Sequence, residues 1–464
     1  MRLYIILIAI LICLLLLFNS YYWQIIPLCS ITIWLLVDRF FLSNKNSKKM
    51  MSNLFWGISI PVVILGTFIT LTFIPLFNIP NPEGSYSLGT MYFTLRDSSR
   101  NDTISKVSSG IREIHTQVWY PAKLKGSEKR DIYIPSAKKF SKIFATSQGI
   151  FWFPFVLNHL GKTRTNSYLN AQIEGSGARY PVVVFSHGLG QFYKFNTILI
   201  EELASNGYIV IAISHPFDTP CTINSKNELI EYKTREITGE KNTRAIDTSE
   251  LSTIFKRISV TDDLSELREL YKVFYNSMPV TWNQQNKNWV QDILFTIREL
   301  NSINFKEFKG CMDLKAIGVL GFSFGGGASG LAAMSDTTIK AGINLDGWQP
   351  GHLNNNYFNC PFMFISSEEH KGANDFFLKY SEHKVFDLTI EGTKHPNFND
   401  MAIILGKTGR FSGLTGKIEG GYGLDVIEKL VINFFDLYLK KIENIDIVNC
   451  LEYYQEIHYQ TNTR

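Results

Sequence analysis

A serine stands between glycines in GFSFGGG, the segment at residues 321–327. The apolar run Ala316–Leu320 precedes this segment and predicts a buried strand, and the small residues after it are able to start a helix. A serine at such a junction is held on a tight turn that needs small neighbours and exposes its hydroxyl group. The same pattern also occurs in glycine turns without chemistry. Ser323 is therefore a candidate nucleophile, and it needs a base, an acid and an oxyanion hole from elsewhere in the chain.

The candidate base is a histidine downstream of the serine, because in this type of turn the order along the chain is Ser, acid, His. Four histidines lie between Ser323 and the last predicted helix: His352, His370, His383 and His395. His395 is in EGTKHPNF, after the last strand-like run and among turn residues, where a base on a loop belongs. We expect the other three histidines to be solvated loop residues.

Two places along the chain offer an acid for this histidine. Asp346, in NLDGW, ends one strand-like run, and Glu368 and Glu369, in ISSEE, end the next. The acid has to accept a hydrogen bond from the imidazole and hold its tautomer. Composition and topology leave both places open.

The oxyanion hole needs backbone N–H groups that point at the developing negative charge. The residue after the nucleophile, Phe324, supplies one, and the loop SHGLG at 186–190 supplies the other through Leu189. His187 lies too early in the chain to be the base, and we interpret it as a residue that shapes this loop.

Four motifs in this order, FSHGLG, GFSFGGG, NLDGW and GTKHPNF, resemble the platelet-activating factor acetylhydrolase family of the α/β-hydrolase superfamily. The early strand IREIHTQVWYPA is also similar, and the resemblance extends from Gly89 to the last helix. It implies that Asp346 is the acid, and it implies calcium-independent hydrolysis of short acyl groups from phospholipids. The chain departs from the family at Phe322, where many members have His or another residue, and in its apolar N-terminus.

Buried strands and helices alternate through the middle of the chain. YPVVVFSHGLG, FNTILIEELASNG and YIVIAISHP predict strand, helix and strand in turn, which is the pattern of an α/β sheet. The sequence thus predicts an α/β-hydrolase fold, a mostly parallel sheet with helices on both faces. We place this catalytic domain at 112–445, after a linker and first strand at 79–111 and before a C-terminal tail at 446–464.

The first 78 residues predict a membrane region. Three apolar runs, at about 3–18, 21–37 and 54–77, predict three transmembrane helices. A span needs about 20 apolar residues, so the third run is long enough, whereas the first two are short and would depend on the interfacial residues Tyr21, Tyr22 and Trp23. A cleaved signal peptide is the alternative, but Asn19-Ser20-Tyr21-Tyr22 is a poor cleavage site. Basic residues gather between the second and third runs, which predicts an integral membrane protein whose catalytic domain is extracytoplasmic.

Composition excludes several classes of function. The formal net charge is +4 over 464 residues, without a long basic run, which argues against a nucleic-acid partner. Six cysteines lack C-x-x-C spacing, so neither a zinc knuckle nor a dense disulfide framework is indicated. No Lys-Ser/Thr pair follows the glycines of GFSFGGG, as a phosphate-binding loop would require. We expect no metal and no organic cofactor.

The sequence therefore predicts a membrane-anchored serine esterase of the lipase type that cleaves short acyl esters through an acyl-enzyme, with a lipid or small ester as substrate. A generalist carboxylesterase or an acyltransferase would use the same residues. A non-catalytic membrane scaffold is the alternative from another class, and the complete set of Ser, His, acid and oxyanion residues argues against it. The aromatic stretch GIFWFPFVL at 149–157 is either a buried cap over the pocket or a lid that touches lipid.

Overall fold

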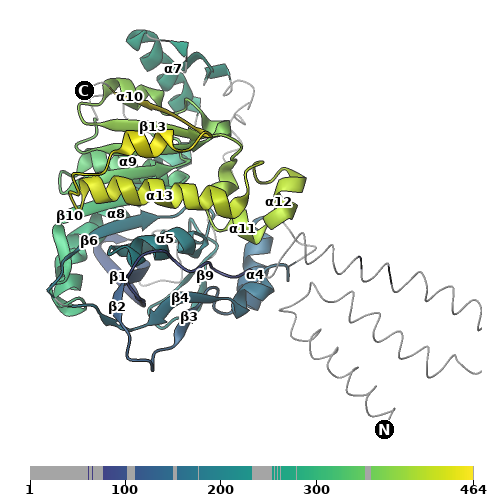
Figure 1. Cartoon of the computed structure of the whole chain (residues 1–464), viewed down its shortest axis with the longest axis vertical. Coiled ribbons are helices and arrows are strands. Elements are labelled where there is room, and N and C mark those ends of the chain that lie inside the picture. The colour runs from purple at the N-terminus through teal and green to yellow at the C-terminus, as the bar shows by residue number, and fades with distance from the viewer. Residues whose placement is uncertain are drawn as a thin grey trace, which may run out of the picture. The chain divides into compact units, whose positions relative to one another are not determined.

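A computed structural model describes residues 77–101, 110–149, 154–175, 177–232, 263–277, 280–350 and 357–462, with parts of 253–261 and single residues at 61 and 65 (Figure 1). The chain divides into two compact units. The smaller comprises 1–79, 132–164 and 403–413, and the larger comprises 80–131, 165–402 and 414–464. The predicted domain at 112–445 is thus interrupted by segments of the smaller unit.

The described part of the smaller unit is helical. It contains α4 (Ala137–Ser147), η4 (Asn158–Lys162) and α12 (Gly406–Ser412). In α4, Phe140 and Phe144 are one turn apart, buried and stacked at 5.5 Å between ring centroids, as expected for the apolar side of an amphipathic helix.

The larger unit is built on a mixed sheet of 12 strands, which confirms the predicted α/β class. Its strands are β1 (Leu88–Asn101), β2 (Ile111–Lys123), β3 (Arg130–Ile132), β4 (Arg164–Leu169), β5 (Gln172–Ile173), β6 (Tyr180–Ser186), β7 (Ile209–Ser214), β10 (Met312–Phe322), β11 (Ile339–Leu345), β12 (Phe362–Ser367), β13 (Val385–Ile390) and β14 (Ile457–Thr461). They lie in the order β14-β13-β12-β11-β10-β6-β7-β2-β1-β4-β3, and β5 pairs with β2. A separate hairpin joins β8 (Cys221–Ile223) to β9 (Leu229–Glu231).

The six strands from β7 to β13 in this order run parallel to their neighbours. Every residue of β6, β7, β12 and β13 is buried, which explains why these strands read as continuous apolar runs rather than alternating ones. Parallel strands present their carboxyl ends at one edge, so the turns after β6, β10, β11 and β13 are brought together there.

Helices and short 3-10 turns connect these strands. They are η5 (Tyr193–Asn196), α5 (Thr197–Ser205), α7 (Leu264–Ser277), α8 (Val280–Lys306), α9 (Phe324–Ser335), η6 (Glu368–His370), α10 (Asp375–Tyr380), η7 (His395–Phe398), α11 (Met401–Ile404), α13 (Gly420–Tyr438) and α14 (Ile447–Glu452). Helices α5 and α13 pack together on one face of the sheet, and α8 and α9 pack together on the other (Figure 1).

Strand β10 shows how the two faces are built. Ile317 and Val319 belong to the same apolar core as Trp289 of α8 and Ala332 of α9. Gly318 points to the other face, where an added Cβ would lie 2.8 Å from Cδ1 of Leu439. The glycine therefore lets the C-terminal end of α13 approach the sheet closely.

Within 446–464, predicted as a C-terminal tail, residues 447–452 form α14 and residues 457–461 form the edge strand β14. This strand pairs antiparallel with β13, with Ile457 opposite Ile390. The alternation in IHYQT is too short to distinguish an edge strand from a tail in the sequence alone.

The predicted spans at 3–18 and 21–37, and nearly all of 54–77, lie outside the described residues. In the part of the chain that the structure describes, no helix combines the length and the apolar composition needed to cross a bilayer. Residues 150–153 of the aromatic stretch at 149–157, predicted as a cap or a lid, also lie outside the described residues.

Candidate active site

Ser323 is the single residue between the end of β10 and the start of α9. Its backbone has φ 57° and ψ −123°, a conformation that a residue with a side chain adopts only at an energetic cost. Its N–H donates to the carbonyl of Leu345 at 2.8 Å, and its own carbonyl accepts from the N–H of Gly326 at 2.9 Å. The turn predicted from GFSFGGG is thus formed and held on both sides.

The glycines around Ser323 are required by close packing. A Cβ on Gly325 would overlap the carbonyl oxygens of Ser186 and His187, and a Cβ on Gly321 would overlap the backbone of Gly325. The first turn of α9 therefore packs directly on the loop that follows β6, because no side chains separate them.

Asp346 follows the last residue of β11 and is 1% exposed. Its Oδ2 atom lies 2.6 Å from Nδ1 of His395, and its Oδ1 atom accepts from the N–H of Ser367 at 2.6 Å. Burial by itself would raise the pKa of Asp346, but hydrogen bonds from His370 and His395 outweigh burial and hold that pKa well below its usual range. The carboxylate is thus ionised and hydrogen-bonded to the predicted base.

His395 begins η7, in the loop after β13. Its ring is stacked on that of Phe322, with 4.7 Å between centroids and 25° between the planes. Phe322, at which the chain departs from the family pattern, therefore supports the face of the imidazole.

Ser323, Asp346 and His395 line one pocket of about 370 Å³. The pocket is lined by Leu189, Trp282, Asn283, Asn286, Ser323, Phe324, Asp346, Gly347, Trp348, Pro350, His370 and His395. Three aromatic rings give it mainly apolar walls, which is typical of a site for a small organic group.

Both residues predicted for the oxyanion hole lie at this pocket. Phe324 opens α9, so its N–H has no acceptor within the helix. Leu189 lies in the loop after β6, where the N–H of Gly190 donates to the carbonyl of Asp218 at 2.9 Å.

The two glutamates that the sequence offered as alternative acids lie elsewhere. Glu368 is exposed and accepts from the N–H of Gly392 at 3.1 Å, and Glu369 pairs with Nζ of Lys394 at 3.3 Å. In the described part of the chain, neither glutamate is hydrogen-bonded to His395. The structure therefore brings Asp346, and not these glutamates, to the imidazole.

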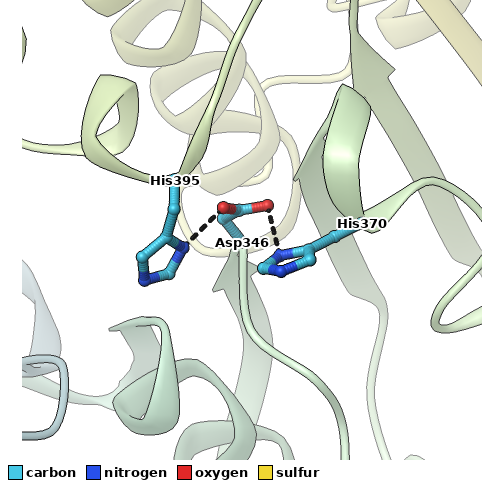
Figure 2. Close-up of side chains that lie close together, drawn as sticks. All are labelled: Asp346, His370 and His395. Carbon is cyan, nitrogen blue, oxygen red and sulfur yellow. Dashed lines mark hydrogen bonds and ion pairs between the residues drawn. The ribbon is translucent and has the colours of Figure 1, made fainter. Parts of the chain in front are cut away.

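His370 lies in the pocket, although it was predicted to be a solvated loop residue. Its Nδ1 atom is 3.0 Å from Oδ1 of Asp346, so two imidazoles approach the two oxygens of one carboxylate, as Figure 2 shows. That prediction was wrong because sequence position does not show that the turn after β12 brings His370 to the carboxylate that follows β11. For His383, exposure agrees with the prediction, and His352 lies outside the described residues.

A comparison with protein families decides where this chain belongs. The model of the platelet-activating factor acetylhydrolase, isoform II, family matches residues 71–456. The chain belongs to this family. Platelet-activating factor acetylhydrolase of Cavia porcellus is 26% identical over 397 residues, covering 80% of each chain, and that of Canis lupus familiaris is 25% identical over 387 residues, covering 79% of each.

Membership in the platelet-activating factor acetylhydrolase family makes the chain a carboxylic ester hydrolase, of the serine type, that acts on acyl esters. Among solved structures, a ferulic acid esterase from Streptomyces cinnamoneus has the same fold. The TM-score is 0.60 at 20% identity, and the match covers 82% of this chain and 99% of that one. The predicted α/β-hydrolase architecture of this family member thus agrees with a solved esterase.

In this acetylhydrolase family member, His187 is hydrogen-bonded within the loop after β6, which agrees with its interpretation as a residue that shapes this loop. Its Nδ1 donates to the carbonyl of Gly188 at 2.8 Å, and its Nε2 accepts from the N–H of His215 at 3.1 Å. Burial lowers the pKa of His187 to about 3, which keeps the ring neutral as these contacts require.

A buried network that the sequence did not reveal lies behind the same loop. His215 Nε2 is 2.8 Å from Oγ of Ser186, and His215 Nδ1 is 2.9 Å from Oδ2 of Asp292. Arg112 donates to both oxygens of Asp292, at 2.7 and 2.6 Å, and Trp289 stacks on His215 at 3.8 Å. All three members of this Ser-His-Asp chain are buried, which favours a structural contact that anchors the loop over contact with a substrate.

Asp346, His370 and His395 also have ligand atoms within 4.8 Å of one another, close enough to approach a metal ion. The separations of 2.6 and 3.0 Å are hydrogen-bond lengths, at which each Nδ1 carries a proton. A metal would have to displace both protons and widen both contacts, so the arrangement in this family member fits acid–base chemistry better than metal binding.

Proposed function

We propose that the chain is a membrane-anchored hydrolase that removes short acyl groups from phospholipid esters through Ser323, His395 and Asp346. The observation that supports this proposal most strongly is the 2.6 Å contact between Asp346 and His395. Both residues line the same pocket as Ser323, which lies on a strained turn. Strain of this kind is found where a side chain has to be held at a functional site.

Each residue has a defined role in the proposed reaction. The Ser323 hydroxyl attacks the ester carbonyl while Nε2 of His395 takes its proton, and the N–H groups of Leu189 and Phe324 bind the oxyanion. His395 then returns the proton to the leaving alcohol, which leaves an acyl-serine. Water, activated by the same imidazole, hydrolyses this ester. Asp346 keeps the Nδ1–H of His395 in place and stabilises the imidazolium in both steps.

A short acyl group is proposed because the pocket, at about 370 Å³, is small and is walled by Trp282, Phe324 and Trp348. The names of the curated relatives support an acetyl-bearing phospholipid as the substrate class. The three apolar N-terminal runs support a membrane anchor, and the basic residues between the second and third runs support an extracytoplasmic catalytic domain.

Acyl release from a panel of esters by the full chain in detergent tests the proposal. The panel contains a phospholipid with an sn-2 acetyl group, the same lipid with a long sn-2 chain, and a neutral acetyl ester. We expect the acetyl phospholipid to be the best substrate. Ser323→Ala should lower its hydrolysis by roughly three orders of magnitude or more and abolish fluorophosphonate labelling.

The matched control is Ser335→Ala, which removes an exposed hydroxyl at the far end of α9 and should change neither readout. Activity that survives Ser323→Ala would refute the nucleophile. A preference for long acyl chains would refute the substrate class, and acyl transfer to an added alcohol in preference to water would identify an acyltransferase.

A further inference from the structure

We propose that His370 is a positioning residue of the hydrolytic site: it shares Asp346 with His395, holds the carboxylate in its working orientation, and extends activity to lower pH. The inference rests on the proposed function, because it assigns His370 a role in the same reaction. The observation behind it is the pair of imidazoles on the two oxygens of one buried carboxylate (Figure 2).

The hydrogen bonds of Asp346 show why a second imidazole matters. Oδ2 faces only His395 among its described hydrogen-bond partners, at 2.6 Å, whereas Oδ1 has two partners, Nδ1 of His370 at 3.0 Å and the N–H of Ser367 at 2.6 Å. A carboxylate rotates easily about its terminal bond. Donors on Oδ1 oppose that rotation and so keep Oδ2 directed at His395.

His370 is itself held in place. It ends η6, the short turn directly after β12, and its carbonyl accepts from the N–H of Ala373 at 3.1 Å. The ring of Trp348 meets the His370 ring edge to face, with 5.5 Å between centroids. The side chain is 21% exposed, so it borders the pocket rather than free solvent.

The charges around His370 favour its protonated form. It faces Asp346 at the end of β11, His395 on η7 at 5.6 Å between ring centroids, and Glu369 on its own turn, which Lys394 partly neutralises. Burial lowers the pKa of His370, but the hydrogen bond and the negative charge of Asp346 outweigh burial and raise that pKa above its ordinary value.

A protonated His370 opposes a second positive charge on the neighbouring ring of His395. The charge on His370 therefore acts on the ring that takes the proton of Ser323, and we expect loss of that charge to move the acid side of the activity profile to higher pH. Because both rings contact one carboxylate, substitution of His370 should change the pH dependence of the reaction as well as its rate.

Two substitutions distinguish the effect of the His370 hydrogen bond on the orientation of Asp346 from the effect of the His370 charge. His370→Asn retains an N–H donor near the position of Nδ1 but cannot carry a charge, and His370→Ala removes both. We expect His370→Ala to lower kcat about tenfold, as loss of a charge-assisted hydrogen bond would. His370→Asn should restore kcat to within about threefold of the wild type at the optimum pH.

The pH profile of kcat/KM distinguishes the proposed role of His370 from a purely structural one, because a structural role would leave this profile unchanged. In both variants the acid-side half-maximal pH should rise by about half a unit to one unit, the size expected for a charge at this distance near the surface. The exposed His383 is the matched control, and His383→Asn should leave kcat and the profile unchanged. Thermal unfolding of each variant shows whether the fold is retained.

Equal losses in His370→Ala and His370→Asn with an unshifted profile would overturn the inference, and so would wild-type kinetics in His370→Ala. If the wild type hydrolyses no ester, or if Ser323→Ala remains active, the proposed function fails instead. Ser323-dependent hydrolysis that is insensitive to both His370 substitutions refutes the inference alone.

Discussion

Asp346 and His395 are 49 residues apart in sequence, and Oδ2 of the first lies 2.6 Å from Nδ1 of the second. The two residues follow β11 and β13, which are separated in the sheet only by β12. Because these strands run parallel, the turns after them meet at one edge, next to the turn that holds Ser323. Sheet topology therefore assembles the candidate site from three separate segments.

The acid is tested by comparing three carboxylates. Asp346→Asn should reduce ester hydrolysis by roughly three to four orders of magnitude, since an amide is able to hold the imidazole in the wrong tautomer. Glu368→Gln and Glu369→Gln should change it less than about threefold, because both glutamates are exposed. Steady-state kinetics with the acetyl phospholipid measures the activity of all three variants. A larger loss in a glutamate variant than in Asp346→Asn would show that the acid is in the turn after β12.

The buried Ser186–His215–Asp292 network behind the loop after β6 should be needed for stability. Asp292 pairs with both Arg112 and Arg100, so Asp292→Asn leaves two guanidinium groups facing a neutral amide at a mostly buried position, and we expect a loss of about 3–5 kcal/mol in the free energy of unfolding. Glu113→Gln is the control, because it breaks an exposed pair with Arg96 and should cost less than about 1 kcal/mol. Denaturant unfolding provides the comparison, and equal effects would contradict an anchoring role.

Glu428 on α13 should make the fold less stable as pH rises. Burial, together with the nearby Glu202 and Asp400, raises its pKa to about 9, and its Oε1 has no hydrogen-bond partner among the described residues. The unfolded chain ionises this carboxyl near pH 4.5, whereas the folded chain keeps the proton until about pH 9, so stability falls as pH rises through that window.

Glu428→Gln should therefore stabilise the fold by at least about 1 kcal/mol more at pH 8 than at pH 5. The exposed Glu443→Gln should show no such difference between the two pH values. Thermal unfolding at both pH values checks this, and a gain that is the same at pH 5 would mean that the carboxyl is not protonated in the fold.

The proposed orientation in the membrane is tested with reporters in intact cells. A reporter after Arg464 should be accessible from outside, and one inserted after Asn46, in the basic segment between the second and third apolar runs, should be shielded. Protease protection of both reporters would reject an extracytoplasmic catalytic domain.

Ser323 could be predicted as the nucleophile from its neighbours in the sequence, because a tight strand-to-helix turn requires glycines and these lie within the seven residues 321–327. His395 followed from chain order. The place of His370 did not, because its contact with Asp346 joins the turns after β12 and β11, and no local pattern in the sequence records that contact. The Ser186–His215–Asp292 network was missed for the same reason, since its members come from β6, the loop after β7 and α8.

The sequence by itself determined the class of sheet, the turn that carries the serine, the loop that carries Leu189, and the histidine most suited to be the base. Each of these depends on periodicity or on neighbouring residues along the chain. The family resemblance already favoured Asp346 over the two glutamates, but only the tertiary structure brought Asp346 within hydrogen-bond distance of His395, placed His370 on the same carboxylate, and added β14 to the edge of the sheet. Those outcomes depend on which strands pair and on distances across the fold. Asp346, Glu368 and Glu369 are all acidic and all follow a strand between Ser323 and His395, so only the folded structure shows which of them reaches the imidazole.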